Sequence, residues 1–160
     1  MKKYVVIILA IGAVTGIIWL AGSSMIKAGS VDFKDATYLM DGRPITMSSP
    51  GIKYFGNSAY GDFNADGNED VSFLFTYNGG GSGTFFYVTA ALGSKKGYFG
   101  TNTVLLGDRI APQTSYFQDG TIIVNYADRY PGEPMTTRPS LGVSKYLIIS
   151  ENGSLREIMN

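Results

Sequence analysis

Short runs of alternating apolar and polar residues follow one another along most of this chain, and they restrict its fold more than any other feature. The runs are rich in β-branched and aromatic residues, and turn signals containing glycine separate them. Outside the N-terminal segment, no stretch longer than a few residues keeps a helical period. The sequence therefore predicts an all-β fold, a small antiparallel sandwich or barrel-like domain of about six to nine strands after one N-terminal apolar helix.

The clearest local signal is a long hairpin in the middle of the chain. Two aromatic-rich runs at 71–77 and 84–92 flank the glycine-rich stretch 78–83. Apolar residues occupy both alternating positions in these runs, whereas a strand with one solvated face has them on one side only. We therefore expect this hairpin to lie in the centre of a sheet, with the glycine-rich stretch as its exposed tip.

Shorter hairpin signals lie on both sides of the central hairpin. Asp-Gly pairs at 41–42 and 119–120 separate strand-like runs, and Asn-Gly at 152–153 precedes a short final segment. Pro44 follows the first pair, and proline cannot donate a backbone hydrogen bond inside a sheet. We therefore expect the strand that contains Pro44 to lie at a sheet edge or to be irregular.

The N-terminal segment has the composition of a membrane anchor or signal segment. An uncharged apolar run from Tyr4 to Gly22 follows Lys2 and Lys3, which favour a cytoplasmic N-terminus and an exported remainder. Small residues around Ser23 leave cleavage of a signal peptide as the alternative to an uncleaved anchor. The expected localisation is the cell envelope, single-pass and membrane-anchored through residues 4–22, or secreted or periplasmic after cleavage.

The expected domain organisation follows from this segment. Residues 1–22 form the anchor or signal segment, residues 23–30 a short polar tether, and residues 31–160 one exported β domain. The whole chain has 13 basic and 13 acidic residues, and beyond the N-terminus its only adjacent lysines are Lys95 and Lys96. Nucleic acid is therefore not an expected partner.

One stretch carries a candidate binding site. Between 60 and 71, oxygen-bearing side chains recur at alternate positions around Gly67, which is the spacing of a calcium loop. Gly67 falls where such a loop turns sharply, and glycine accepts a positive φ at little cost. The expected Ca2+ ligands are the side chains of Asp62, Asn64, Asp66 and Asp70 and the backbone carbonyl of Asn68. The alternative is a solvated turn without an ion, because the same residue types favour turns.

The form of this loop distinguishes it from an EF-hand. An EF-hand loop ends in a bidentate Glu at position twelve and has a helix on each side, whereas position twelve here is Phe73 in a predicted strand. An Asp-x-Asn-x-Asp-Gly-x-x-Asp loop that leads directly into a strand resembles the single calcium loop of FG-GAP and VCBS-type repeats. The resemblance implies the ligand roles given above. It does not imply a propeller, because the motif occurs once. Over roughly residues 55–147, the order of motifs is also similar to that of small exported bacterial domains.

The composition excludes several classes of active site. The chain contains neither histidine nor cysteine, so Ser-His and Cys-His nucleophiles and zinc sites with imidazole or thiolate ligands are impossible. Only carboxylate chemistry remains, with Asp108, Asp128 or Glu133 beside Arg109 or Arg129. These pairs adjoin strand ends, where ion pairing is the ordinary role. We name no catalytic residue and expect that the protein is not an enzyme.

The functional expectation is a calcium-binding β module of the cell envelope that serves as a binding or accessory domain held at the membrane. An envelope protein or a glycan is a possible partner, and the sequence does not distinguish between them. Two alternatives stay open, an inhibitor or adhesion protein that acts through its loops and a carboxylate-based hydrolase. A cleft with two carboxylates would favour the hydrolase, whereas an exposed aromatic face would favour a binding module.

Overall fold

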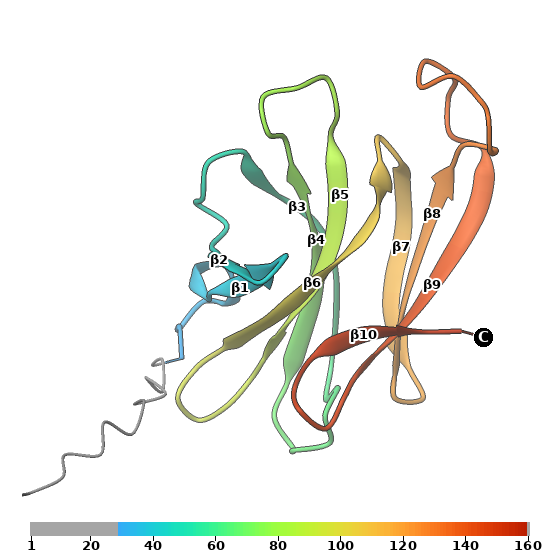
Figure 1. Cartoon of the computed structure of the whole chain (residues 1–160). Coiled ribbons are helices and arrows are strands. Elements are labelled where there is room, and N and C mark those ends of the chain that lie inside the picture. The colour runs from blue at the N-terminus through green and yellow to red at the C-terminus, as the bar shows by residue number, and fades with distance from the viewer. Residues whose placement is uncertain (1–28, 160) are drawn as a thin grey trace, which may run out of the picture.

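The computed structural model describes residues 29–159, and these residues form two β-sheets (Figure 1). The predicted helix and membrane segment at 1–22 and most of the tether lie outside the described residues. The elements are η1 (Phe33–Asp35), β1 (Tyr38–Met40), β2 (Arg43–Ile45), β3 (Ile52–Gly61), β4 (Asp70–Tyr77), β5 (Phe85–Leu92), β6 (Phe99–Asp108), β7 (Ala111–Gln118), β8 (Thr121–Asp128), β9 (Leu141–Ile149) and β10 (Leu155–Ile158). Within this range, no helix is long and apolar enough to cross a membrane. The all-β prediction is confirmed.

The strands pair mainly with their neighbours in sequence. The larger sheet has the order β2-β1-β6-β5-β4-β3 and the smaller one the order β10-β9-β8-β7. All pairs are antiparallel except β1 with β6, which run parallel and meet at Leu39 and Asn102. The hairpins predicted at 41–42 and 119–120 form β1-β2 and β7-β8, and Pro44 lies in the edge strand β2. The short final segment forms β10 against β9.

The central hairpin β4-β5 is apolar on both faces, as its sequence predicts. Each face packs into a different hydrophobic core. The even-numbered Leu74 of β4 faces the smaller sheet, and the odd-numbered Phe73 and Phe75 face the opposite way. Between the sheets lies the main core of Phe63, Leu74, Phe86, Val88, Ala90, Leu106, Ile110, Ile122, Val124, Tyr126, Leu147 and Leu155. The second core contains Ala36, Tyr38, Ile45, Val71, Phe73, Phe75 and Ala91. The segment from η1 to β2 therefore covers the outer face of the larger sheet, as Figure 1 shows.

Polar side chains connect the sheets, and those of Asn57, Asn102 and Tyr126 are among them. The amide of Asn102 on β6 bonds the backbone of Leu155 on β10, with its Nδ2 donating to the carbonyl at 2.9 Å and its Oδ1 accepting from the N–H at 2.9 Å. The Tyr126 hydroxyl on β8 donates to the Leu106 carbonyl on β6 at 3.2 Å. Burial and the nearby Asp128 carboxylate raise the pKa of Tyr126 to about 12. This hydroxyl therefore remains a donor at physiological pH.

Replacing Asn102 with Ala should destabilise the sandwich, because it removes both bonds to the nearly buried Leu155 backbone. Loss of a partner from buried N–H and C=O groups predicts a decrease of about 1–3 kcal/mol in the free energy of unfolding. Urea unfolding measures this loss. Asn78→Ala, at the exposed tip of the β4-β5 hairpin, is the control. An equal loss in the two variants would show that Asn102 does not connect the sheets.

Candidate metal centre

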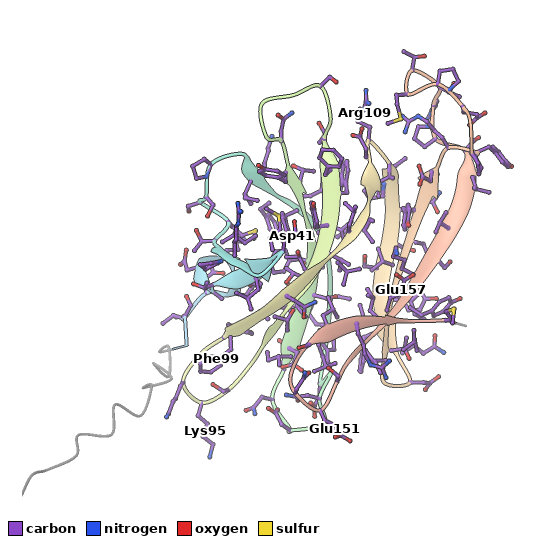
Figure 2. All side chains as sticks on the ribbon, viewed as in Figure 1. Asp41, Lys95, Phe99, Arg109, Glu151 and Glu157 are labelled. Carbon is purple, nitrogen blue, oxygen red and sulfur yellow. The ribbon has the colours of Figure 1, made fainter. Side chains whose placement is uncertain are left out.

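The predicted calcium loop joins β3 to β4 at one end of the sandwich. The turns at 93–97, 119–120 and 150–154 lie at the same end, whereas the glycine-rich tip and the 129–140 loop lie at the other (Figure 1). Lys95 and Glu151 mark the end with the loop in Figure 2, and Arg109 marks the opposite end. Any ion held by this loop would therefore lie far from the glycine-rich tip.

Hydrogen bonds to the Asp62 carboxylate close the first part of the loop. Its Oδ1 accepts from the Asp66 N–H at 3.0 Å, and its Oδ2 accepts from the Gly67 N–H at 2.8 Å. Gly67 has a φ of 83°, so the chain turns at the residue that the spacing predicts. Ala65 also has a positive φ, 60°, which costs a non-glycine residue about 1–2 kcal/mol. The spacing of oxygen-bearing residues gave no indication of this strained position.

Asp66 lies at the centre of the loop's polar contacts. Its Oδ1 accepts from the backbone N–H and from Nδ2 of Asn68, both at 2.8 Å, and its Oδ2 accepts from Asn64 Nδ2 at 3.1 Å. The Asn64 Oδ1 accepts in turn from the Asp66 N–H at 3.1 Å. The bonds from Asn68 are the main reason that the pKa of Asp66 lies below its usual value. Asp66 is exposed and ionised at neutral pH.

Asp70 differs from the other loop residues because its side chain is completely buried. Its Oδ2 accepts from the Phe63 N–H at 2.8 Å, and its Oδ1 accepts from the Gly93 N–H at 2.7 Å. Burial raises the pKa of Asp70, the two N–H bonds oppose that shift, and the negative charges of Asp66 and Asp62 add to it. The net pKa is above the usual value. Asp70 therefore links the loop to the turn that follows β5.

The chain at Gly93 lies against the loop so closely that only glycine fits. A Cβ at Gly93 would lie 2.2 Å from the carbonyl oxygen of Glu69, closer than side-chain carbons approach a backbone oxygen. The Glu69 side chain itself is exposed. The close contact at Gly93 brings its N–H within reach of the Asp70 carboxylate. This partner cannot be predicted from the sequence, because a glycine that follows a strand gives no sign of a contact 23 residues earlier.

The structure brings four of the five predicted ligands into one hydrogen-bonded turn and places the fifth in the interior. Asp62, Asn64, Asp66 and Asn68 share the turn, while the Asp70 carboxylate is directed toward Phe63 and Gly93. Within residues 29–159, no three acidic, histidine or cysteine side chains are grouped closely enough to hold a metal ion between them. The loop has the all-oxygen side-chain chemistry that a hard cation prefers, and its carboxylates here accept from N–H donors.

The loop carboxylates form no ion pair in the part of the chain that the structure describes. The two ion pairs found there are Arg109 with Asp108, at 3.0 Å, and Lys145 with Glu157, at 2.6 Å. The charges of Asp62 and Asp66 nevertheless reach Asp70 strongly enough to raise its pKa. The 93–97 turn brings Lys95 and Lys96 to the same end, where they line a groove with Asn68 and Glu69 of the loop.

The other candidate carboxylates hold the opposite end of the sandwich together. Burial alone would raise the pKa of Asp108, but bonds from the Arg109 side chain and the Thr84 N–H hold this pKa below its usual value. Arg129 donates to the carbonyls of Thr137, Asp108 and Arg109 at 2.6, 3.3 and 3.1 Å. Asp128 and Glu133 accept from the N–H groups of Arg129 and Tyr130. These contacts support a structural role.

Comparison with protein-family models, with curated proteins and with solved structures gives no match for this chain.

The raised pKa of Asp70 should be visible in the pH dependence of stability in calcium-free solution. Above its ordinary pKa of 3.8 and below its raised folded-state pKa, Asp70 binds more protons in the folded than in the unfolded state. Its contribution to the free energy of unfolding therefore falls as the pH rises through that interval. Because Asn does not titrate, the stability advantage of the wild type over Asp70→Asn should shrink from acidic to neutral pH.

Urea unfolding at a series of pH values in EDTA measures this difference. Asp119→Asn in the exposed β7-β8 turn is the matched control, since it removes a carboxylate that is not buried. An advantage of the wild type over Asp70→Asn that grows toward neutral pH would contradict the raised pKa.

Proposed function

We propose that the loop at 62–70 binds calcium and that the protein is a calcium-binding β module of the cell envelope, held at the membrane as a binding or accessory domain. One observation carries the proposal. The carboxylates of Asp62, Asp66 and Asp70 belong to one loop and form no ion pair in the described residues, and the charges of Asp62 and Asp66 add to the raised pKa of Asp70. A divalent cation would supply the missing positive charge.

The donor chemistry supports this ion more than a transition metal. The Asp and Asn side chains offer oxygen, the Asn68 backbone adds a carbonyl, and the chain has no histidine or cysteine to favour zinc. A carboxylate oxygen that accepts one N–H bond keeps a second lone pair, so the N–H bonds to Asp62 and Asp70 are compatible with a cation. Around Asp66, calcium would replace the amide N–H groups of Asn64 and Asn68.

Calcium binding would also act on the rest of the fold. Asp70 is the first residue of the central strand β4, and its carboxylate bonds the turn after β5. A cation near this carboxylate favours its charged form and so opposes the pKa shift that burial causes. Ligand binding to the folded state alone adds stability by mass action, about 2.7 kcal/mol at a hundredfold excess over the dissociation constant.

Calorimetry and thermal unfolding with and without calcium test the ion. We expect a dissociation constant of about 10⁻⁴ to 10⁻³ M, the range of extracellular modules, because no bidentate Glu closes the loop. Asp66→Ala should remove most of the calcium-dependent rise in melting temperature, since Asp66 lies at the centre of the loop contacts. Glu69→Ala is the matched control and should leave that rise nearly intact, because Glu69 is exposed and lies outside the ligand pattern.

Two results would overturn the calcium proposal. The first is the absence of calorimetric binding at millimolar calcium. The second is an equal loss of the calcium response in Asp66→Ala and Glu69→Ala, which would indicate a nonspecific effect of charge. In either case the loop is a turn stabilised by its own hydrogen bonds.

The envelope localisation rests on the apolar run from Tyr4 to Gly22. N-terminal sequencing of the mature protein from the membrane fraction should show an intact N-terminus, because an uncleaved apolar segment retains the protein in the bilayer. A mature chain that begins near Ser23 and is recovered from the soluble fraction would instead establish a removed signal peptide and a periplasmic or secreted protein.

The second candidate function is an inhibitor or adhesion protein that acts through its loops. It is favoured by the end of the sandwich opposite the acidic loop, where Tyr130 is 53% exposed and Met135 is 40% exposed. Large apolar side chains at a loop tip are suited to contact with another protein. The hydrolase alternative has no comparable support, because the carboxylates at that end are bonded to neighbouring backbone and arginine groups.

A further inference from the structure

The outer face of the smaller sheet carries a continuous row of large side chains across all four strands. Tyr116 of β7 pairs with Ile123 of β8, Ile123 pairs with Tyr146 of β9, and Tyr146 pairs with Ile158 of β10. Paired residues lie side by side on the same face of a sheet. These four residues therefore form one line perpendicular to the strands, here named the tyrosine row.

Tyr116, Tyr146 and Ile158 of the tyrosine row are open to solvent, whereas Ile123 between the two tyrosines is only 9% exposed. Side chains alternate between the two faces of a sheet, and the neighbouring Phe117, Ile122 and Leu147 pack into the core between the sheets. Tyr116 is 42% exposed, and Tyr146 is half-buried. The row borders a shallow groove of about 280 Å³. The groove is lined by Gln118, Asp119, Thr121, Ile123, Tyr146 and Ile158.

A second row, of neutral polar residues, lies beside the tyrosine row on the same face. Asn125 pairs with Ser144, its Nδ2 donates to the Thr114 hydroxyl at 2.9 Å, and its Oδ1 accepts from the Ser144 hydroxyl at 2.6 Å. Hydroxyl and amide groups can accept and donate further hydrogen bonds to a ligand. The two rows together have no formal charge, and Asp119 and Arg156 near them carry opposite charges.

We infer that this face binds an extended, uncharged glycan chain of the β-1,4-linked class. Neighbouring strands lie about 4.8 Å apart, so the tyrosines on β7 and β9 are separated by about 10 Å. The disaccharide repeat of an extended β-1,4-linked chain has a similar length. Each tyrosine can therefore stack on the apolar C–H face of an alternate pyranose ring, while the polar row bonds the hydroxyl groups at the ring edges.

The charge and the size of the face argue against other occupants. Nucleic acid and anionic lipid need clusters of lysine and arginine, which neither row contains. A stable dimer buries about 800 Å² on each partner. β7, β8 and β9 have eight or nine residues and β10 has four, so the face spans roughly 450 Å² by strand spacing and rise. The face is thus too small to hold a second copy of this chain by itself, and its neutral polar row suits a polyhydroxyl ligand.

Isothermal titration calorimetry of the full domain with cellohexaose and with chitohexaose tests the inference. We expect binding of at least one of the two, weakened tenfold or more in Tyr116→Ala and in Tyr146→Ala. Tyr146→Phe should keep most of the affinity, because it retains the ring. Tyr60→Ala is the matched control, since Tyr60 is 54% exposed but lies on β3 of the larger sheet. Thermal unfolding of each variant checks that it is folded.

Three results would overturn the inference. They are the absence of binding to both oligosaccharides by the wild type, an equal loss of affinity in Tyr60→Ala, and a dimer in sedimentation velocity that Tyr146→Ala dissociates. The inference does not rest on the calcium loop. Glycan binding should persist in EDTA and in Asp66→Ala, so failure of the glycan experiment and failure of the calcium experiment are separate results.

Discussion

The end of the sandwich with the acidic loop depends on one buried carboxylate, that of Asp70. Its two oxygens accept from N–H groups of Phe63, within the loop, and Gly93, in the turn after β5. Each bond satisfies a donor that would otherwise be buried without a partner, at a cost of about 1–3 kcal/mol. The turn after β5 in turn leads to Tyr98, whose backbone pairs with Ser30 near the start of the described residues. The Asp70 side chain thereby connects the loop to the turn after β5, and the backbone of that turn's last part connects to Ser30.

The position of Asp70 follows from the central hairpin. β4 has apolar side chains on both faces, so the sheet must be covered on both sides, by β7–β10 on one and by the segment from η1 to β2 on the other. Asp70 begins β4 at the end where the loop and the turn after β5 lie against each other. The carboxylate at that residue is buried, and the bonds from the Phe63 and Gly93 N–H groups compensate in part for its lost hydration.

Local sequence signals predicted the parts of the structure that depend on neighbours in the chain. The Asp-Gly pairs, the edge position of Pro44 and the positive φ of Gly67 each arise within a few residues. Contacts between distant segments had no such signal. The parallel pairing of β1 with β6 and the bonds of Asn102 to Leu155 depend on how two sheets meet. For the same reason, the spacing predicted five equivalent ligands in the loop. In the structure these residues are not equivalent, because Asp70 is buried and Asp66 is exposed.

Protonation is a poor way to neutralise Asp70. A protonated carboxyl group is a weaker acceptor than a carboxylate, so protonation would weaken the bonds from the Phe63 and Gly93 N–H groups. The raised pKa is therefore opposed by the same two bonds that hold the loop in place. A cation bound away from the Phe63 and Gly93 N–H groups would reduce the repulsion between the Asp70 carboxylate and those of Asp62 and Asp66. It would leave both N–H bonds intact. Under the calcium proposal, the ion would offset the charge of Asp70 without weakening the two bonds that a proton would weaken.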